Sequence, residues 1–159
     1  DVKEQNEISG LKPLEMLEDL EVLKFTDTRI NDLVAIKDLK NIRELICPRN
    51  PIDNLIPISN FRKLQVLDCS NTLISDLEPL KDIKSLTVLK ISGTKVRGLK
   101  DIENLKELVH LDISATKVML LKPVKELPKL KVLKCYNTNI LKMFINSFKE
   151  EHPGCEVIN

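Results

Sequence analysis

Residues 89–96 read LKISGTKV and residues 111–118 read LDISATKV, so one eight-residue pattern returns after 22 positions. The leading leucine keeps that spacing along most of the chain, at Leu23, Leu45, Leu67, Leu89, Leu111 and Leu133. A fixed period of roughly 20 to 50 residues is typical of a solenoid, in which similar units stack and share one core. The spacing therefore predicts an elongated, repeated architecture.

Each repeat is expected to begin with a short strand. Its apolar residues stand two positions apart, as in Leu67 and Cys69 or Leu89 and Ile91, which places both side chains on one face. Five residues after the leading leucine comes a column of polar side chains that can hydrogen-bond the backbone where the chain turns: Thr28, Asn50, Thr72, Thr94, Thr116 and Thr138.

The second half of each repeat has an apolar residue at every third position, for example at Leu33, Ile36, Leu39 and Ile42. A period of three favours 3₁₀ or short helical turns over an α-helix. A proline near the start of this segment costs no helical hydrogen bond, and it recurs at Pro13, Pro57, Pro79 and Pro123.

The two ends depart from the pattern. Residues 1–22 form an incomplete first repeat, because Asp1 and Lys3 stand where a strand would need apolar residues. Residues 23–140 are the regular repeats, and residues 141–159 are expected to cap the core. We interpret the whole chain, 1–159, as a single domain.

Within the cap, the spacing of Phe144 and Phe148 predicts a helix over Met143–Glu151 whose aromatic face covers the core. His152, Pro153 and Gly154 would end this helix. Cys155 follows Leu133 by 22 residues, so a last strand is expected to start there and to include Val157.

The repeat resembles the leucine-rich repeat superfamily, in the 22-residue class of phosphatase regulatory subunits, internalin-type proteins and many secreted bacterial proteins. The resemblance is carried by the run from Leu20 to Phe25, the Thr/Asn column, and Leu77-Glu78-Pro79-Leu80. It implies an α/β, right-handed solenoid with a short-stranded parallel sheet on the concave face and 3₁₀ or short helical turns on the convex face. It also implies protein recognition across that sheet. Threonine replaces the asparagine of the wider superfamily in most repeats.

Composition narrows the possible partners. The 25 basic and 24 acidic residues give a net charge of +1, which argues against nucleic acid or an anionic membrane. No apolar stretch approaches the ~20 residues of a membrane helix. The absence of an initiator methionine is compatible with a processed, secreted chain, whereas free core thiols would favour a reducing or anaerobic setting. The compartment stays open.

The residues do not favour catalysis. Cys47, Cys69 and Cys135 occupy the inward column, so they are interpreted as small core residues without a disulfide. The chain has two histidines, His110 and His152, too few for a zinc site of the usual type. It has no glycine-rich phosphate loop. We therefore predict no catalytic residue, no metal and no cofactor.

Two outward columns flank the leading leucine on the concave face. The column after it carries charges of alternating sign from Asp68 to Lys134 and is interpreted as a ladder that neutralises itself. The column before it is mostly valine, which is either a strand-forming preference or a contact surface. On the second interpretation the partner-binding residues are Ile46, Val66, Val88, His110, Val132 and Tyr136, with Leu73 beside them.

Met119 and Leu120 stand where other repeats have polar pairs. They are explained either by packing against Leu141 and the cap or by a second partner patch. The sequence as a whole predicts a non-enzymatic module that binds a partner protein through its concave sheet. The alternative is a structural segment of a larger repeat-containing surface or secreted protein. Partner identity and oligomeric state stay open.

Overall fold

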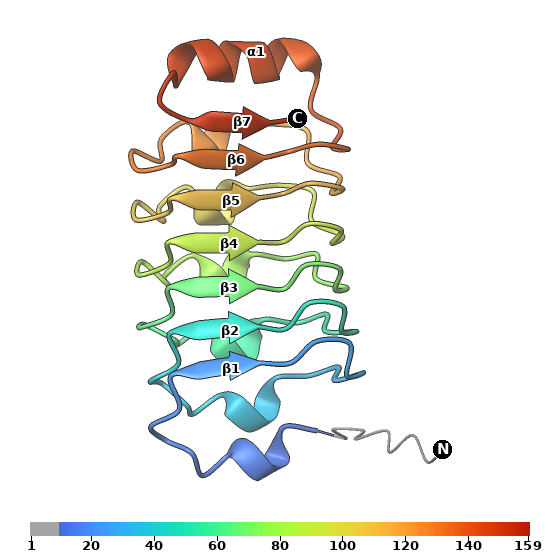
Figure 1. Ribbon diagram of the computed structural model, residues 1–159, viewed down its shortest axis with the longest axis vertical. Coiled ribbons are helices and arrows are strands. Elements are labelled where there is room, and N and C mark those ends of the chain that lie inside the picture. The colour runs from blue at the N-terminus through green and yellow to red at the C-terminus, as the bar shows by residue number, and fades with distance from the viewer. Residues whose placement is uncertain (1–9) are drawn as a thin grey trace, which may run out of the picture.

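The computed structural model describes residues 10–159, in which seven short strands form one parallel sheet in chain order (Figure 1). Neighbouring strands pair so that Leu67 lies beside Leu89 and Leu89 beside Leu111, which confirms the 22-residue stacking. The strands are β1 (Val22–Lys24), β2 (Glu44–Ile46), β3 (Val66–Asp68), β4 (Val88–Lys90), β5 (His110–Asp112), β6 (Val132–Lys134) and β7 (Glu156–Ile158).

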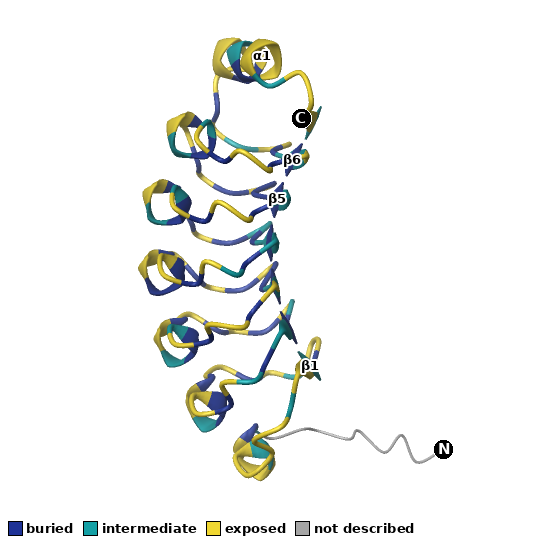
Figure 2. Cartoon of the chain, turned by 90° about the vertical axis from the view of Figure 1, so that its left-hand side faces the viewer, coloured by how far each residue is buried: buried dark blue, intermediate teal, exposed yellow. Residues whose placement is uncertain are grey.

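Short 3₁₀ helices form the opposite side of the molecule, as the period of three predicts. Proline occupies one of the first two positions in η1, η3, η4 and η6. Figure 2 shows the strands lining the concave side of an arc and these helices lying along its convex side. They are η1 (Lys12–Leu14), η2 (Val34–Ile36), η3 (Ile56–Ile58), η4 (Glu78–Leu80), η5 (Lys100–Ile102) and η6 (Lys122–Val124).

The core lies between these two sides. The leading leucines from Leu45 to Leu133 have no exposed surface, and neither do most apolar residues of the period-three segments. At the N-terminal end, Leu14 and Leu23 are only partly buried and Met16 is 85% exposed. The core therefore has an open end in the part of the chain that the structure describes. Asp1 and Lys3, used above to argue for an incomplete first repeat, lie outside the described residues.

The turn after each strand has a recurrent backbone conformation. Its φ angle is positive at the position before the Thr/Asn column: Asp27, Arg49, Asn71, Gly93, Ala115 and Asn137. The side chain of the Thr/Asn column, one residue later, hydrogen-bonds the backbone of this turn. The Thr72 hydroxyl, for example, donates to the Cys69 carbonyl at 2.7 Å. From Asn50 onward the polar column therefore bonds the backbone as predicted, whereas the Thr28 hydroxyl donates to the Asn50 side chain.

The cap contains the expected helix, α1 (Lys142–Glu151), at the end of the stack (Figure 1). Its buried residues are Ile145 and Phe148, whereas Phe144 is 38% exposed. The prediction that Phe144 covers the core is wrong. Residues three apart share a helix face as well as residues four apart, and here the face toward the core is the one with Ile145 and Phe148.

The register of the last strand also differs from the prediction. Leu133 pairs with Val157 rather than with Cys155, so the last connection is two residues longer than the repeat. An α-helix rises about 1.5 Å per residue and a 3₁₀-helix about 2.0 Å, so an α-helical connection needs more residues to cover the same distance. Cys155 is buried just before β7.

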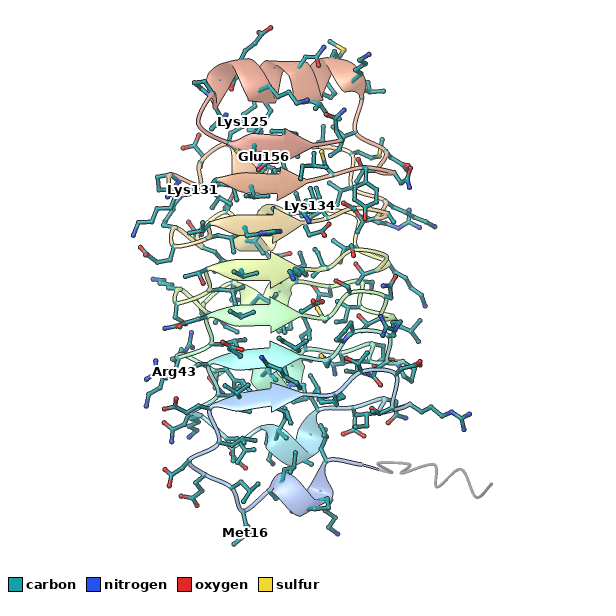
Figure 3. The ribbon with its side chains drawn as sticks, viewed as in Figure 1. Met16, Arg43, Lys125, Lys131, Lys134 and Glu156 are labelled. Carbon is teal, nitrogen blue, oxygen red and sulfur yellow. The ribbon has the colours of Figure 1, made fainter. Side chains whose placement is uncertain are left out.

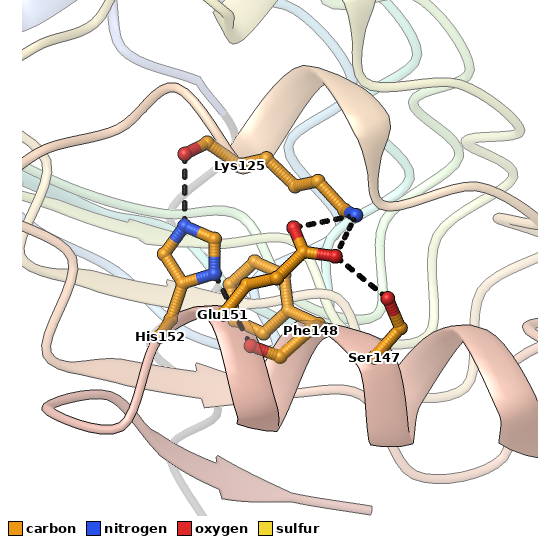
Figure 4. Close-up of polar contacts among 5 residues, drawn as sticks. All are labelled: Lys125, Ser147, Phe148, Glu151 and His152. Carbon is orange, nitrogen blue, oxygen red and sulfur yellow. Dashed lines mark hydrogen bonds and ion pairs between the residues drawn. The ribbon is translucent and has the colours of Figure 1, made fainter.

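The cap is fixed to the last 3₁₀ segment by polar contacts (Figure 4). The Lys125 ammonium and the Glu151 carboxylate are 2.7 Å apart, and Glu151 also accepts a hydrogen bond from Ser147. The His152 ring lies 2.9 Å from the Lys125 carbonyl oxygen through Nε2 and stacks on Phe148 at 4.3 Å. These contacts hold α1 against the rung that contains η6, where a rung is one strand together with the 3₁₀ segment that follows it.

Candidate functional site

The concave face is built by the first and third residues of each strand, because the middle residue points into the core. In the first column Val66 pairs with Val88, Val88 with His110, and His110 with Val132. Adjacent strands lie about 4.8 Å apart, so these four side chains form one continuous row across β3 to β6. The pairing brings together four of the six residues predicted to bind a partner.

These four side chains are half-buried, although the sequence predicted an exposed strip. Within a sheet, each outward side chain is partly covered by its equivalents on both neighbouring strands. Val22, on the first strand of the sheet, is 45% exposed. Glu44 and Glu156 border the row at its two ends. The row is thus a partly accessible apolar surface with a charged residue at each end.

The other two predicted residues lie outside the row. Ile46 belongs to the third-residue column, between Lys24 and Asp68. Tyr136 follows β6 by two residues and is 45% exposed. Leu73 lies beyond β3 and is 42% exposed. These residues therefore lie beside the row, as the sequence interpretation has them, rather than within it.

The charges of the third-residue column are only partly paired. The Lys24 ammonium is 3.1 Å from the Glu44 carboxylate, and the Lys90 ammonium is 3.8 Å from Asp68. Lys134, labelled on the concave face in Figure 3, forms no ion pair with any described residue. Within the alternating charges from Asp68 to Lys134 that are interpreted as a ladder, Asp68 and Lys90 form an ion pair, whereas Asp112 and Lys134 form none with a described residue.

His110 occupies the middle of the apolar row. Burial lowers the pKa of its imidazole, and the ammonium groups of Lys134 and Lys90 lower it further. Its Nε2 atom is buried and has no hydrogen-bond partner among the described residues. His110 is therefore neutral at pH 7 and contributes to the face chiefly through its ring.

Comparison with known proteins places this geometry in a known fold. An internalin (inlF) and internalin C2, both from Listeria monocytogenes, superpose with TM-scores of 0.84 and 0.86 at 22% and 27% identity, over 91% and 93% of this chain. The chain folds as a leucine-rich repeat solenoid. A leucine-rich repeat protein of Leptospira interrogans also superposes over 93% of the chain, with a TM-score of 0.72 and 20% identity.

The chain spans 42%, 64% and 51% of the lengths of these three structures, in the order given. No family model matches the sequence, and no curated protein matches it. The leucine-rich repeat fold thus rests on structural likeness together with the 22-residue period.

The thiols of this leucine-rich repeat chain are core groups. Burial raises the pKa of Cys47 to about 12 and that of Cys135 to about 11, and it also raises the pKa values of Cys69 and Cys155. All four are free, as predicted for Cys47, Cys69 and Cys135. Within residues 10–159, no three histidine, cysteine or acidic side chains gather as a metal site would require. No helix of this segment is long and apolar enough to cross a bilayer.

One surface of the leucine-rich repeat was located only in part from the sequence. Met119, Leu120 and Leu141 are each 59% exposed, so none of the three is a core residue. Met119 and Leu120 line a groove of about 540 Å³ with Leu99 and Pro123. A second groove of about 400 Å³ lies beside it, where Leu120 and the exposed Phe144 contribute. The replacement of a polar pair by Met119 and Leu120 was the sequence signal for this surface.

Proposed function

We propose that this leucine-rich repeat chain binds a partner protein through its concave face and performs no catalysis. The observation that carries the proposal is the row Val66, Val88, His110 and Val132, which is apolar, continuous across β3–β6 and partly accessible. Repeat solenoids use extended concave surfaces of this kind for binding. The apolar row would supply the dry centre that protein interfaces need.

Tyr136 adds a second element to the proposed interface. Interface energy concentrates in a few residues, among which tyrosine is enriched. Tyr136 is 45% exposed and lies two residues after Lys134, on the parity that faces away from the core. It would therefore extend the contact from the apolar row toward the C-terminal end of the strands.

The chemistry of the described side chains supports binding rather than catalysis. The thiols are held protonated by burial, which removes the reactive thiolate at neutral pH. His110 has a buried Nε2 without a partner, so no neighbouring acid or nucleophile is arranged around that atom.

A structural role within a larger protein is the second candidate. One observation favours it: the matched structures are longer than this chain, which covers 42% to 64% of them. On this reading the solenoid would hold neighbouring parts of a surface or secreted protein in place, and its concave face would have no partner.

Capture from native extract distinguishes the two functions. We expect Val88→Glu and Tyr136→Ala each to remove the captured protein, because they alter the apolar centre and its aromatic border. Lys84→Glu and Glu103→Lys, in the period-three segments away from the sheet, serve as controls and should retain it. A melting temperature within a few degrees of the parent's must accompany each result. Retention by the concave variants and loss by the controls would move the binding site to the convex side.

A further inference from the structure

The two grooves beside the cap share three residues. Leu120, Lys122 and Glu126 line both the groove of about 540 Å³ and the groove of about 400 Å³, so they form the centre of one surface. We call the residues that line the two grooves the flank surface. No strand residue lines either groove, so the flank surface is separate from the concave face.

The flank surface exposes large apolar side chains. Met119 and Leu120 are each 59% exposed, and Phe144, which lines the smaller groove, is 38% exposed. Leu141 stands 22 residues after Met119, at the equivalent position of the next repeat, and is also 59% exposed. A group of exposed apolar side chains at one place marks an interaction surface more often than a chance feature of a monomer.

Local stability does not account for Leu120. The equivalent residues of earlier repeats are Asp32, Asn54 and Asp76, whose side-chain oxygens accept the backbone N–H two residues later at 3.0, 2.8 and 2.9 Å. A leucine side chain cannot accept this hydrogen bond. Leu120 therefore gives up a local bond and exposes apolar surface, a combination that becomes favourable only when another molecule covers it.

The charges at the centre of the flank surface are of opposite sign and unpaired. Lys122 and Glu126 are both exposed, and neither forms an ion pair with a described residue. Because one offsets the other, this centre favours neither an acidic nor a basic partner. It is complementary to a surface that carries the same two charges in the opposite order.

A second copy of the chain presents such a surface. In a dimer with two-fold symmetry, if residue i of one copy contacts residue j of the other, then j of the first also contacts i of the second. An axis through the centre of the flank surface would bring Lys122 of each copy to Glu126 of the other. Both charges would then be paired, and Leu120 would be buried beside them.

We propose that this chain forms a two-fold symmetric dimer through the flank surface. Met119 and Leu120 of each copy bury against the grooves of the other, and Lys122 of each copy pairs with Glu126 of the other. The proposal goes beyond the proposed function, because both concave faces remain free in such a dimer.

Sedimentation of the full chain over a range of protein concentrations tests the proposal. The parent should be a dimer at high concentration and a monomer at low concentration. Leu120→Glu should raise the dissociation constant about tenfold or more, because it places a charge in the apolar centre. Ile56→Glu is the matched control and should change the constant less than about twofold, since Ile56 is 64% exposed in η3 but lines neither groove.

The charge pairs are tested by exchanging their signs. Lys122→Glu alone and Glu126→Lys alone should each weaken the dimer about tenfold, because like charges then face each other across the axis. An equal mixture of the two variants should associate nearly as tightly as the parent, since each copy supplies the charge that the other lacks. Restored association would also show that both variants are folded.

Any of three results would overturn the proposal. The first is a parent that stays monomeric up to about 1 mM. The second is an equal effect of Leu120→Glu and Ile56→Glu, and the third is a mixture of the two charge variants that associates no more tightly than either alone. The concave function is tested separately, because Val88→Glu should dimerise as the parent does whether or not it captures a partner.

Discussion

Asn50 makes more hydrogen bonds than any threonine of its column. Its Nδ2 lies 3.1 to 3.3 Å from the carbonyl oxygens of Phe25, Cys47 and Pro48, and its Oδ1 accepts from the Thr28 backbone N–H at 2.9 Å. The hydroxyl of Thr28 also donates to Asn50 Oδ1, whereas the hydroxyls of the later threonines each donate to one carbonyl within their own turn, as Thr72 does to Cys69. Asn50 therefore links its own repeat to the preceding one, whereas the later threonines bond only within their own repeat.

We expect Asn50→Ala to lower the free energy of unfolding by about 2 to 4 kcal/mol, since it leaves several backbone groups near the core unpaired. Thr72→Ala, at the equivalent position one repeat later, should cost about 1 kcal/mol because it removes one hydroxyl donor. Urea denaturation of both variants measures the difference. Equal losses would show that the inter-rung bonds of Asn50 add nothing.

The buried thiols make stability depend on pH in the alkaline range. Burial raises the pKa of Cys47 from 9.0 to about 12, so the folded state keeps its proton where the unfolded state has lost it. The stabilisation is fully present below pH 9 and is lost as pH rises from 9 toward 12. We expect the urea midpoint to fall over this range.

Cys47→Ala is the control for this effect. It also removes packing, so its midpoint at pH 8 should lie below the parent's, but its further decline with alkaline pH should be shallower. If the urea midpoints of the parent and of Cys47→Ala fall in parallel with rising pH, Cys47 is not the group that causes the alkaline loss of stability. In the native protein at pH 8, a thiol reagent should likewise modify Cys47 and Cys69 far more slowly than after denaturation.

At the scale of elements, the two phenylalanines of α1 form a matched pair. Phe148 is fully buried and stacks on His152, whereas Phe144 is 38% exposed. Phe148→Ala should cost about 3 to 5 kcal/mol through lost burial and a cavity, and Phe144→Ala should cost less than about 1 kcal/mol. Thermal or urea unfolding of the two variants measures both losses of stability. A greater loss with Phe144→Ala would place the opposite helix face on the core.

The regular elements could be predicted because their signal is repeated. Leu67, Leu89 and Leu111 each predict a strand at the same position of their own repeat, and six segments show the period of three. The cap has no second copy to compare, so neither its buried face nor its register followed from the sequence. Two of the predictions that failed, for Phe144 and for the pairing of Cys155, both lie there.

The candidate site was predicted less completely than the fold. Strand parity was enough to place Val66, Val88, His110 and Val132 on one face. It could not tell that neighbouring side chains half-bury them, or that Asp68 and Lys90 form an ion pair while the adjacent Asp112 and Lys134 do not. Such details depend on side-chain conformations, which the period of a sequence does not determine.

At the scale of the whole molecule, the leading leucines differ by position along the stack. Leu89 is fully buried between two complete rungs, while Leu23, in the same column, is only partly buried. Leu89→Ala should cost about 2 to 5 kcal/mol and Leu23→Ala distinctly less, because the open end can relax around a smaller side chain. Chemical denaturation checks this. A cost below about 0.5 kcal/mol for Leu89→Ala would contradict the rung assignment.

The unequal ends of the stack have a consequence for how the native protein opens. Among the described residues 10–159, the N-terminal end of the stack leaves Met16 and Leu17 exposed, while the C-terminal end is covered by α1 and its contacts with Lys125. Since each rung is supported chiefly by its neighbours, opening should begin at the less supported end and progress inward. Amide deuterium uptake in native buffer should therefore follow a gradient, fastest around β1 and slowest in β4 to β6. The amide exchange rate at equivalent positions of successive strands would then decrease with the distance of the strand from the N-terminal end of the stack.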